Sequence, residues 1–423
     1  MVTRTAGRGG GIEIDLGAEY TEFRHEIRTW LDGHVPAGLR ELADWGGPMF
    51  AGGRRAGRLG RAMADPVYVE WTSRLVGAHL MCPQWPTEVG GRGWDAVRSA
   101  VFSEELRRQG VPAVRRGMGE TLVGPAIIVH GTDEQRAYFL PRIVSGEDVY
   151  CQGYSEPNHG SDLAGVETRG IVDGDELVIT GQKCWTSGAH HANMMFVLCR
   201  TDPAAPKHRG LSYVLVPFSA ANGVSVQAVR QMSGAAEFCD DFLDGARAPL
   251  FNVIGGLNNG WRPAMTTLGY ERGGNATTAH LGYEQELAEL IDLARANGAA
   301  RDPRIRQRLM WCYTQVELMR YAGLRTLSSL VQGGEPGPEA SGAKLRWSEY
   351  HRTFGELAME VVGAASMVRP DGEGYETTEW QDTFLASSAG TIYSGTSEIQ
   401  RNIVAERALG LSREPRVATG TDT

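Results

Sequence analysis

The stretch VETRGIVDGDELVITGQK, residues 166–183, has the alternation of β-strands in a chain whose other long segments are mostly helical in pattern. Its two strand-like runs meet at Asp173-Gly174, and an Asp-Gly pair between such runs is typical of a β-hairpin. Further short strand-like segments follow, separated by Pro, Gly and Asn: NMMFVLCRT, LSYVLVPF and VSVQAVR. We therefore predict an antiparallel β domain over residues 148–257.

Helical patterns flank this β domain on both sides. In the N-terminal part, GTDEQRAYFLPRIVSG (131–146) opens on a Thr132-Asp133 cap signal and closes at a glycine. In the C-terminal part, apolar residues recur at i, i+3, i+4 and i+7, as in Phe354, Leu357, Ala358 and Val361. We predict an α+β protein with five segments: a disordered N-terminus (1–17), an N-terminal helical domain (18–147), the β domain (148–257), a C-terminal helical domain (258–412) and a flexible tail (413–423).

The composition is that of an ordinary soluble globular protein, with 42% hydrophobic and 22% charged residues among 423. The net charge of −9 argues against nucleic acid or an anionic membrane as the main partner. No stretch approaches ~18 uninterrupted apolar residues. The six cysteines lie far apart without a C-x-x-C pair, so reduced thiols in a cytoplasmic protein are expected.

Several familiar ligand motifs are missing from the sequence. There is no G-x-x-x-x-G-K-[ST] loop and no G-x-G-x-x-G between a strand and a helix, so neither a P-loop NTPase nor a Rossmann enzyme is expected. H-E-x-x-H is absent too, and the adjacent His190 and His191 would point apart. No metal site is expected.

Two stretches of the β domain combine turn glycines with hydroxyl groups. In YSEPNHGSDLAG (154–165), hydroxyls and turn amides can bond the edge of a heterocycle or a pyrophosphate, although a plain Asx or Ser turn explains them equally. In GQKCWTSGAHHAN (181–193), Trp185 precedes two hydroxyl residues. Taken alone, Trp185 is more typical of a packing aromatic than of a cofactor contact.

Together with YSGTSEIQRNIVAERALGL (393–411), these stretches resemble the acyl-CoA dehydrogenase family. The match covers nearly the whole chain, because GTDEQRAYFLPRIVSGE, YSEPNHGSD, GQKCWTSGAH, KHRGLSYVLVPF and GTSEIQRNI occur in the order that the family has. The resemblance implies an N-terminal helical domain, a middle antiparallel β-barrel or sandwich and a C-terminal four-helix bundle. It also implies FAD bound without a Rossmann motif.

The resemblance also implies roles for individual residues. Tyr154 and Ser155 would contact the pyrimidine edge of the flavin, and Ser161 would reach the FAD pyrophosphate or the CoA arm of the substrate. Trp185 would cover one flavin face, with the Ser187 hydroxyl near N5. Thr396 and Glu398 would lie in the loop that borders the cofactor.

The catalytic base is expected in TLGYERGGNATT (267–278), where a Glu-Arg pair lies among glycines. Many family members carry a glutamate immediately before GTS, but this chain has Ser394 there, and a serine without an adjacent base cannot abstract the α-proton at neutral pH. Resemblance to members with the base on another helix implies Glu271 instead. A solvent-facing or salt-bridged glutamate is the alternative. Arg272 would neutralise charge near the substrate or only pair structurally, and the Ser394 N–H would donate to the thioester oxygen.

In this family, two segments hold the FAD of a neighbouring subunit, and this chain keeps little of the motif of either. ARANGAARDPRIRQRL (294–309) lacks R-x-x-F-G, and EVVGAAS (360–366) keeps one glycine of Q-x-x-G-G-x-G. Side chains at Ala364 and Ser366 would crowd a pyrophosphate. We therefore expect either a heterotetramer with a related chain or a homo-oligomer, such as a homotetramer, with substitute contacts.

The predicted activity is FAD-dependent dehydrogenation of an acyl-CoA to a 2,3-enoyl-CoA, with electrons passed to an electron-transferring flavoprotein. Glu271 would remove the α-proton while flavin N5 takes the β-hydride. A base on this helix often accompanies bulky acyl groups in the family, so a steroid side-chain or another branched acyl-CoA is expected, in fatty-acid or steroid side-chain β-oxidation. The alternatives are an acyl-CoA oxidase that uses O₂ and a non-catalytic partner subunit, against which Glu271 argues.

Overall fold

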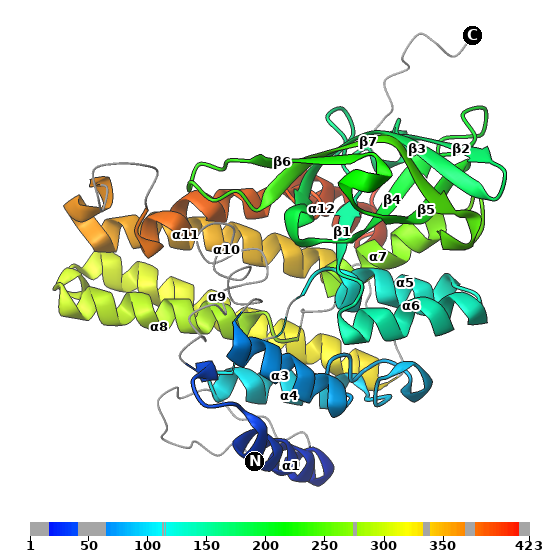
Figure 1. Ribbon diagram of the computed structural model, residues 1–423. Helices are drawn as coiled ribbons and strands as arrows, with labels where there is room; N and C mark the ends of the chain where they lie inside the picture. Colours follow the sequence, from blue (N-terminus) through cyan, green and yellow to red (C-terminus); the bar gives the residue numbers. More distant parts are fainter. Residues whose placement is uncertain are drawn as a thin grey trace.

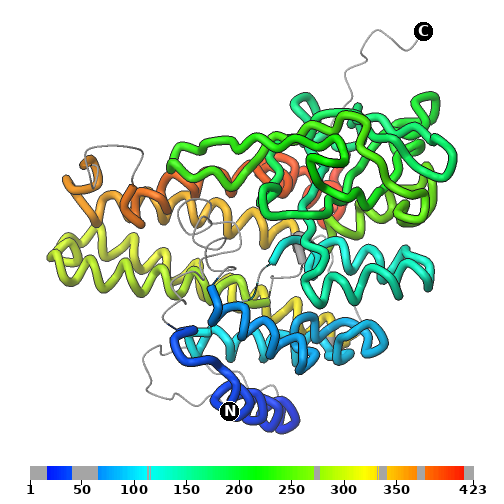
Figure 2. The backbone as a smooth tube through the Cα atoms, in the orientation of Figure 1, coloured from blue at the N-terminus to red at the C-terminus, as the bar shows by residue number. Residues whose placement is uncertain are grey.

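The computed structural model describes residues 17–40, 65–111, 114, 116–273, 277–332, 339–368 and 377–413. Within them the chain passes from N-terminal helices into a β domain and then into a second helical domain, as the colours in Figure 2 show. The expected disordered N-terminus and flexible tail lie outside these ranges, except for residues 17 and 413. The α+β organisation is thus confirmed.

Several α-helices make up the described N-terminal part, and one of them, α6, begins at the cap that the sequence indicates. They are α1 (Ala18–His34), α3 (Pro66–Gly77), α4 (Ala96–Arg108), α5 (Gly124–His130) and α6 (Asp133–Ser145). The Thr132 hydroxyl accepts from the Gln135 N–H, and the Gln135 side chain accepts in return from the Thr132 N–H. At the other end of α6, Gly146 has a φ of 84°, which only glycine adopts without strain.

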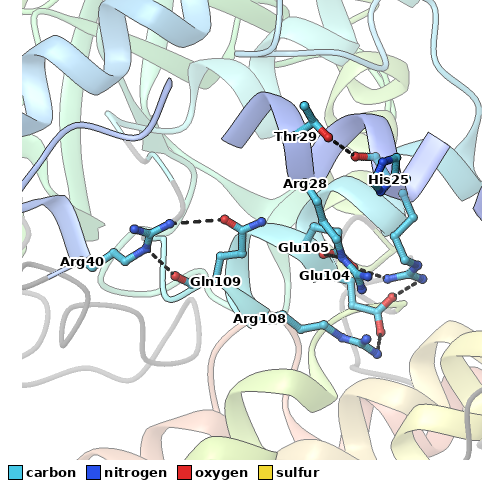
Figure 3. A network of polar contacts seen from close by, with 9 residues as sticks. His25, Arg28, Thr29, Arg40, Glu104, Glu105, Arg108 and Gln109 are labelled. Atoms are coloured by element: carbon cyan, nitrogen blue, oxygen red, sulfur yellow. Dashed lines mark hydrogen bonds and ion pairs between the residues drawn. The ribbon is translucent and has the colours of Figure 1, made fainter. Parts of the chain in front are cut away.

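A buried ionic network joins α1 to α4 (Figure 3). The Glu105 carboxylate, whose side chain is 1% exposed, accepts from Arg24 Nη1 at 2.5 Å and from Arg28 Nε at 2.7 Å. Arg24 also bonds Glu104 at 2.8 Å. Because an unpaired buried carboxylate would be strongly destabilising, this network fixes α1 against the rest of the N-terminal helices.

The β domain is one sheet of eight strands in the order β6-β7-β3-β2-β4-β5-β8, with β1 pairing β4 off this path. The strands are β1 (Tyr150–Gly153), β2 (Arg169–Asp173), β3 (Glu176–Ser187), β4 (Met194–Arg200), β5 (Leu211–Pro217), β6 (Val224–Val229), β7 (Phe238–Pro249) and β8 (Val253–Ile254). The predicted hairpin is β2–β3, and Asp173 pairs with Glu176 across its turn.

The expectation of a purely antiparallel domain is wrong at two places. Strand β1 runs parallel to β4, with Tyr150 opposite Met194, and β2 meets β4 in parallel at Arg169 and Arg200. Parallel partners need a long crossover, and here the chain between β1 and β4 contains the whole β2–β3 hairpin. The sheet is therefore mixed.

Strand β4 contributes to two cores. Its residues Phe196 and Leu198 join a cluster shared with α5 and α6, while Met195 and Val197 join the core inside the β domain. All four side chains are 0% exposed. Burial on both faces explains why this strand is an apolar run rather than an alternating one.

The C-terminal domain is made of helices, and the longest of them, α9 and α10, lie below and to the left of the β domain in Figure 1. They are α7 (Trp261–Gly273), α8 (His280–Ala296), α9 (Pro303–Val331), α10 (Glu339–Val362), α11 (Glu379–Ser387) and α12 (Ser397–Ile403). The predicted apolar face of α10 is confirmed, since Phe354, Leu357 and Ala358 are 0% exposed. No helix in the described ranges is long and apolar enough to cross a membrane.

All six cysteines are buried and none forms a disulfide. In the part of the chain that the structure describes, no group of three or more His, Cys, Asp and Glu side chains is placed to hold a metal ion.

An acidic side chain lies in the core of the β domain. Asp241 on β7 is 0% exposed, and neither carboxylate oxygen has a hydrogen-bond partner among the described residues. Burial raises the pKa of Asp241 from 3.8 to about 6. The charged form is therefore disfavoured in the folded protein, and the stability that the neutral acid contributes is lost as the pH rises through about 6.

Asp241→Asn is accordingly expected to raise the free energy of unfolding by about 2 kcal/mol more at pH 8 than at pH 4.5. Asparagine stays neutral over this range, whereas the wild-type carboxyl must ionise in the core above its raised pKa. Urea denaturation at both pH values measures the difference. Asp244→Asn, at an exposed position of the same strand, is the matched control for the removal of a carboxylate. An equal effect of Asp241→Asn at both pH values would contradict this account.

Candidate cofactor and active site

Four of the predicted cofactor residues come from two adjoining segments of the β domain. Tyr154 and Ser155 directly follow β1, and Trp185 and Ser187 belong to the end of β3. The Cys184 N–H donates to the Ser155 carbonyl at 2.9 Å, which joins the two backbones. The structure therefore brings these four residues into one region of the β domain.

Trp185 has an unusual backbone and an exposed ring. Its φ is 59°, a left-handed conformation that a bulky residue adopts only under strain. It lies at an irregularity in the β3–β7 register, between Lys183 and Thr186. Its side chain is 62% exposed and meets the ring of Phe238 edge-on, with centroids 6.2 Å apart. An exposed indole on a strained strand is unlike a packing aromatic and suits a ligand-facing role.

A buried ion pair next to Tyr154 was not identified from the sequence. Lys183 on β3 is 0% exposed, and its Nζ donates to Glu156 Oε1 at 2.8 Å. The signal was present in the hairpin, because Lys183 follows Leu177 and Ile179 at alternate, inward-facing positions of the strand. Burial alone would raise the pKa of Glu156, but the Lys183 ammonium and the hydrogen-bond donors around the carboxylate lower it.

Ser161 lies in an exposed turn after this segment. Its neighbour Asp162 pairs with Lys207 at 2.5 Å, and Lys207 belongs to the loop between β4 and β5. Arg200 supports this loop, since its Nη1 donates to the Lys207 carbonyl at 3.1 Å and its Nη2 to the Ala164 carbonyl at 2.6 Å. The Ser161 turn and the loop between β4 and β5 thus lie side by side at the surface.

The loop before α12 carries the second group of predicted residues. Ser394 has a φ of 54° and Gly395 a φ of 86°, so two successive residues are left-handed. Gln400 Nε2 fixes the loop by donating to the Ser394 carbonyl at 3.0 Å. Thr396 caps α12, where its hydroxyl accepts from the Ile399 N–H at 3.2 Å.

A pocket with a volume of about 310 Å³ opens at this loop. Its lining residues are Glu349, Arg352, Thr391, Ile392, Thr396, Ser397, Glu398 and Arg401. Arg401 bridges Glu349 at 3.0 Å and Glu398 at 3.5 Å. A hydrogen bond from its own backbone N–H, aided by the Thr396 hydroxyl, lowers the pKa of Glu398. The contribution of Glu349 and Arg352 was not predicted, because α10 lies about 50 residues upstream of the loop.

Glu271 and Arg272 belong to the last turn of α7, and their side chains lie outside the described part of the structure. The helix is anchored before them, since Thr267 Oγ1 lies 3.1 Å from the Tyr213 hydroxyl and Thr266 Oγ1 lies 2.8 Å from His130 Nε2. Ala264 and Thr267 are both 0% exposed. Position 271 follows Thr267 at i+4 and Ala264 at i+7 along the same helix.

Gly269 occupies a different face of α7. A Cβ placed on it would meet no atom within 4 Å. Positions 269 and 271 are two residues apart, which is about 200° around a helix. The free space at Gly269 is therefore not on the side of position 271.

Gly269→Ala is expected to stabilise the protein by about 0.5–1 kcal/mol while turnover stays at the wild-type level. The gain comes from the backbone entropy of glycine in a helix, and urea denaturation combined with steady-state rates measures both quantities. Gly342→Ala, in α10 and equally free of neighbours, is the matched control. If Gly269→Ala lost turnover and Gly342→Ala did not, the substrate would have to lie against the Gly269 face of α7.

The two segments that correspond to the family's FAD-holding motifs, and that keep little of those motifs, lie at one end of the helical domain. Asn297 Nδ2 donates to the Val361 carbonyl at 2.8 Å, which joins the end of α8 to the end of α10. Gly363 has a φ of 69°, and Ala364 beside it is exposed. Ser366 is half-buried, and its carbonyl accepts from Gln381 Nε2 at 2.7 Å.

Models of three acyl-CoA dehydrogenase domains match the chain: the N-terminal domain over residues 18–147, the middle domain over 151–241 and the C-terminal domain over 258–409. The chain is 43% identical over 395 residues to "Acyl-CoA dehydrogenase IpdE1" of Mycobacterium tuberculosis, which covers 93% of this chain and 98% of that protein. A solved structure described as "Tcur3481-Tcur3483 steroid ACAD" has a TM-score of 0.77 at 30% identity and covers 95% of this chain and 100% of its own. The ChsE4-ChsE5 complex from Mycobacterium tuberculosis has a TM-score of 0.75 at 29% identity, with the same coverage.

Proposed function

Because the chain belongs to the acyl-CoA dehydrogenase family, we propose that it forms 2,3-enoyl-CoA thioesters with Glu271 as the base. The chain is an acyl-CoA dehydrogenase, an oxidoreductase. The observation that carries the proposed base is the position of residue 271 on α7, in line with the buried Ala264 and Thr267.

In the proposed mechanism, Glu271 removes the α-proton of the thioester. Ser394 cannot replace it, but its backbone N–H donates to the thioester oxygen, where negative charge develops. Ser394 itself has a left-handed φ of 54°, a conformation that is uncommon for a residue other than glycine. In this proposal, Arg272 neutralises part of the negative charge near the substrate.

Two features of the described residues fit a flavin nucleotide. The Trp185 ring is 62% exposed and supplies a flat apolar face. The pocket of about 310 Å³ beside Thr396 contains Arg352 and Arg401, which are paired with Glu349 and would have to turn from it to donate to phosphate oxygens. When bound, FAD supplies the acceptor for the β-hydride, at flavin N5.

The proposed FAD contacts follow from this fit. Tyr154 and Ser155 hold the pyrimidine edge, Trp185 covers one ring face, and the Ser187 hydroxyl lies near N5. Thr396 and Glu398 border the nucleotide in the pocket before α12. Ser161, in its exposed turn, contacts the pyrophosphate or the CoA arm.

The proposed substrate is a branched acyl-CoA, with a steroid side-chain thioester as the foremost candidate, and the proposed electron acceptor is an electron-transferring flavoprotein. The description of a similar solved structure as a steroid ACAD supports the substrate class. The proposed assembly is a heteromer with a related chain. The two named complexes among the similar structures support it, as does the exposed Ala364 where the family pattern has glycine.

The test is a visible spectrum of the protein, purified with and without a related chain, before and after anaerobic addition of a panel of acyl-CoAs. Bleaching of the flavin band by a branched acyl-CoA is expected. Rapid reoxidation of the reduced protein in air would favour the oxidase alternative over a dehydrogenase. A flavin band that none of the acyl-CoAs bleaches would contradict the proposed substrate class.

A further inference from the structure

We propose that the buried pair of Lys183 and Glu156 positions the flavin-binding segments, so that both residues set the geometry of bound FAD without contacting it. The proposal rests on the FAD site proposed above and extends it to residues outside that site. Its basis is the set of hydrogen bonds that the two side chains make to the backbone around Tyr154.

The Lys183 ammonium has three acceptors, two in the segment that follows β1 and one on β4. Its Nζ donates to Glu156 Oε1 at 2.8 Å, to the Leu198 carbonyl of β4 at 2.8 Å and to the Tyr154 carbonyl at 3.2 Å. Three N–H groups with three acceptors leave none of them unsatisfied. Lys183 therefore links the backbone of Tyr154 to Glu156 and to β4.

The Glu156 carboxylate ties the same segment to the start of β2. Its Oε1 also accepts from the Thr168 N–H at 2.9 Å, and its Oε2 accepts from the Glu167 N–H at 2.6 Å. The Glu156 backbone exchanges two hydrogen bonds of 3.0 Å with His159, which closes the turn leading to Ser161. The pair thus holds both ends of the segment between β1 and the Ser161 turn.

The pair also connects the two sides of the proposed flavin site. Lys183 is two residues before Trp185 on β3, and the intervening Cys184 N–H donates to the Ser155 carbonyl at 2.9 Å. A movement of Lys183 or Glu156 would shift Tyr154 and Ser155 relative to Trp185. Such a shift would change the contacts that bound flavin makes at its pyrimidine edge relative to those at its ring face.

A second buried ionic group provides a control that is remote from the site. Glu105 is 1% exposed and is held by Arg24 and Arg28 in the α1–α4 network of Figure 3. Like Glu156, it is a buried carboxylate with charged partners, but it belongs to the N-terminal helices. Glu105→Gln therefore reproduces the loss of a buried charge without touching the β domain.

The experiment compares wild type, Glu156→Asp, the double variant Lys183→Met/Glu156→Met, and Glu105→Gln, each as the full chain with a related chain where FAD binding requires one. Glu156→Asp keeps the charge and shortens its reach by one methylene group. The double variant removes both charges, which avoids leaving one of them unpaired in the core. The readouts are the FAD dissociation constant from fluorescence titration, the shape of the bound flavin absorption band, and the Tm.

For Glu156→Asp and the double variant we expect an FAD dissociation constant raised on the order of 10-fold, together with a changed flavin band. For Glu105→Gln we expect a lower Tm with the wild-type dissociation constant and band. Wild-type values in Glu156→Asp and in the double variant would overturn the positioning role while leaving the proposed function intact. Absence of FAD binding by the wild type, alone and with a related chain, would overturn the proposed function and this inference with it.

Discussion

Glu271→Gln is expected to lower the rate of flavin reduction by an acyl-CoA by about 10²–10⁴-fold, the contribution that a positioned general base typically makes. Glutamine matches glutamate in size but cannot accept the α-proton. FAD binding should be unchanged, because the proposed FAD contacts lie in the segment after β1, on β3 and in the loop before α12 rather than on α7. Anaerobic stopped-flow measurement of flavin bleaching gives the rate, and the absorption ratio of flavin to protein gives the FAD content.

Glu356→Gln serves as the matched control for this prediction. Glu356 is an exposed residue of α10 in the same helical domain, and its loss of charge should leave the bleaching rate at the wild-type level. If Glu271→Gln left turnover of the assembled protein unchanged, Glu271 would not be the base. The chain would then act as the non-catalytic partner of another subunit's site, the alternative that its sequence leaves open.

The features that could be predicted from the sequence are those set by local interactions. The β2–β3 hairpin follows from strand alternation and an Asp-Gly pair, and in the structure Gly174 has the positive φ, 65°, that such a turn requires. The α6 capping box follows from Thr132 and Gln135, three residues apart. In both cases the residues that determine the conformation are neighbours in the chain.

The features that were missed depend on contacts between distant segments. The parallel pairing of β1 with β4 joins residues 44 apart, such as Tyr150 and Met194, and strand alternation contains no information about the partner. The Lys183–Glu156 pair joins two elements in the same way. A lysine at an inward strand position was visible in the sequence, but its acceptors depend on how β1 and β4 pack around it.

The site residues show the same division. Trp185 could be named from its motif, yet its ring exposure and left-handed φ depend on the irregular pairing of β3 with β7. For Thr396 and Glu398 the motif indicated a cofactor loop, whereas the pocket that they line needs Glu349 and Arg352 from α10. A motif thus identified the residues that face a ligand, and the packing of other elements determined the cavity.

The largest effect on cofactor content is expected from the partner chain. Expressed alone, this protein should bind little FAD, and co-expression with a related chain that carries R-x-x-F-G and Q-x-x-G-G-x-G should yield a complex that retains FAD through purification. The reason is the segment at the end of α10, where Gly363 is followed by the exposed Ala364 and the half-buried Ser366. Side chains there prevent the close backbone approach that a pyrophosphate needs.

Size-exclusion chromatography with light scattering, combined with the flavin-to-protein absorption ratio, measures both assembly and FAD content. A homo-oligomer of this chain that holds one FAD per subunit would contradict the prediction and would require substitute contacts for the pyrophosphate. In a heteromeric complex, Glu271→Gln in this chain then decides which subunit provides the base. If it abolishes flavin bleaching while FAD remains bound, this chain supplies the base and the related chain completes the nucleotide site.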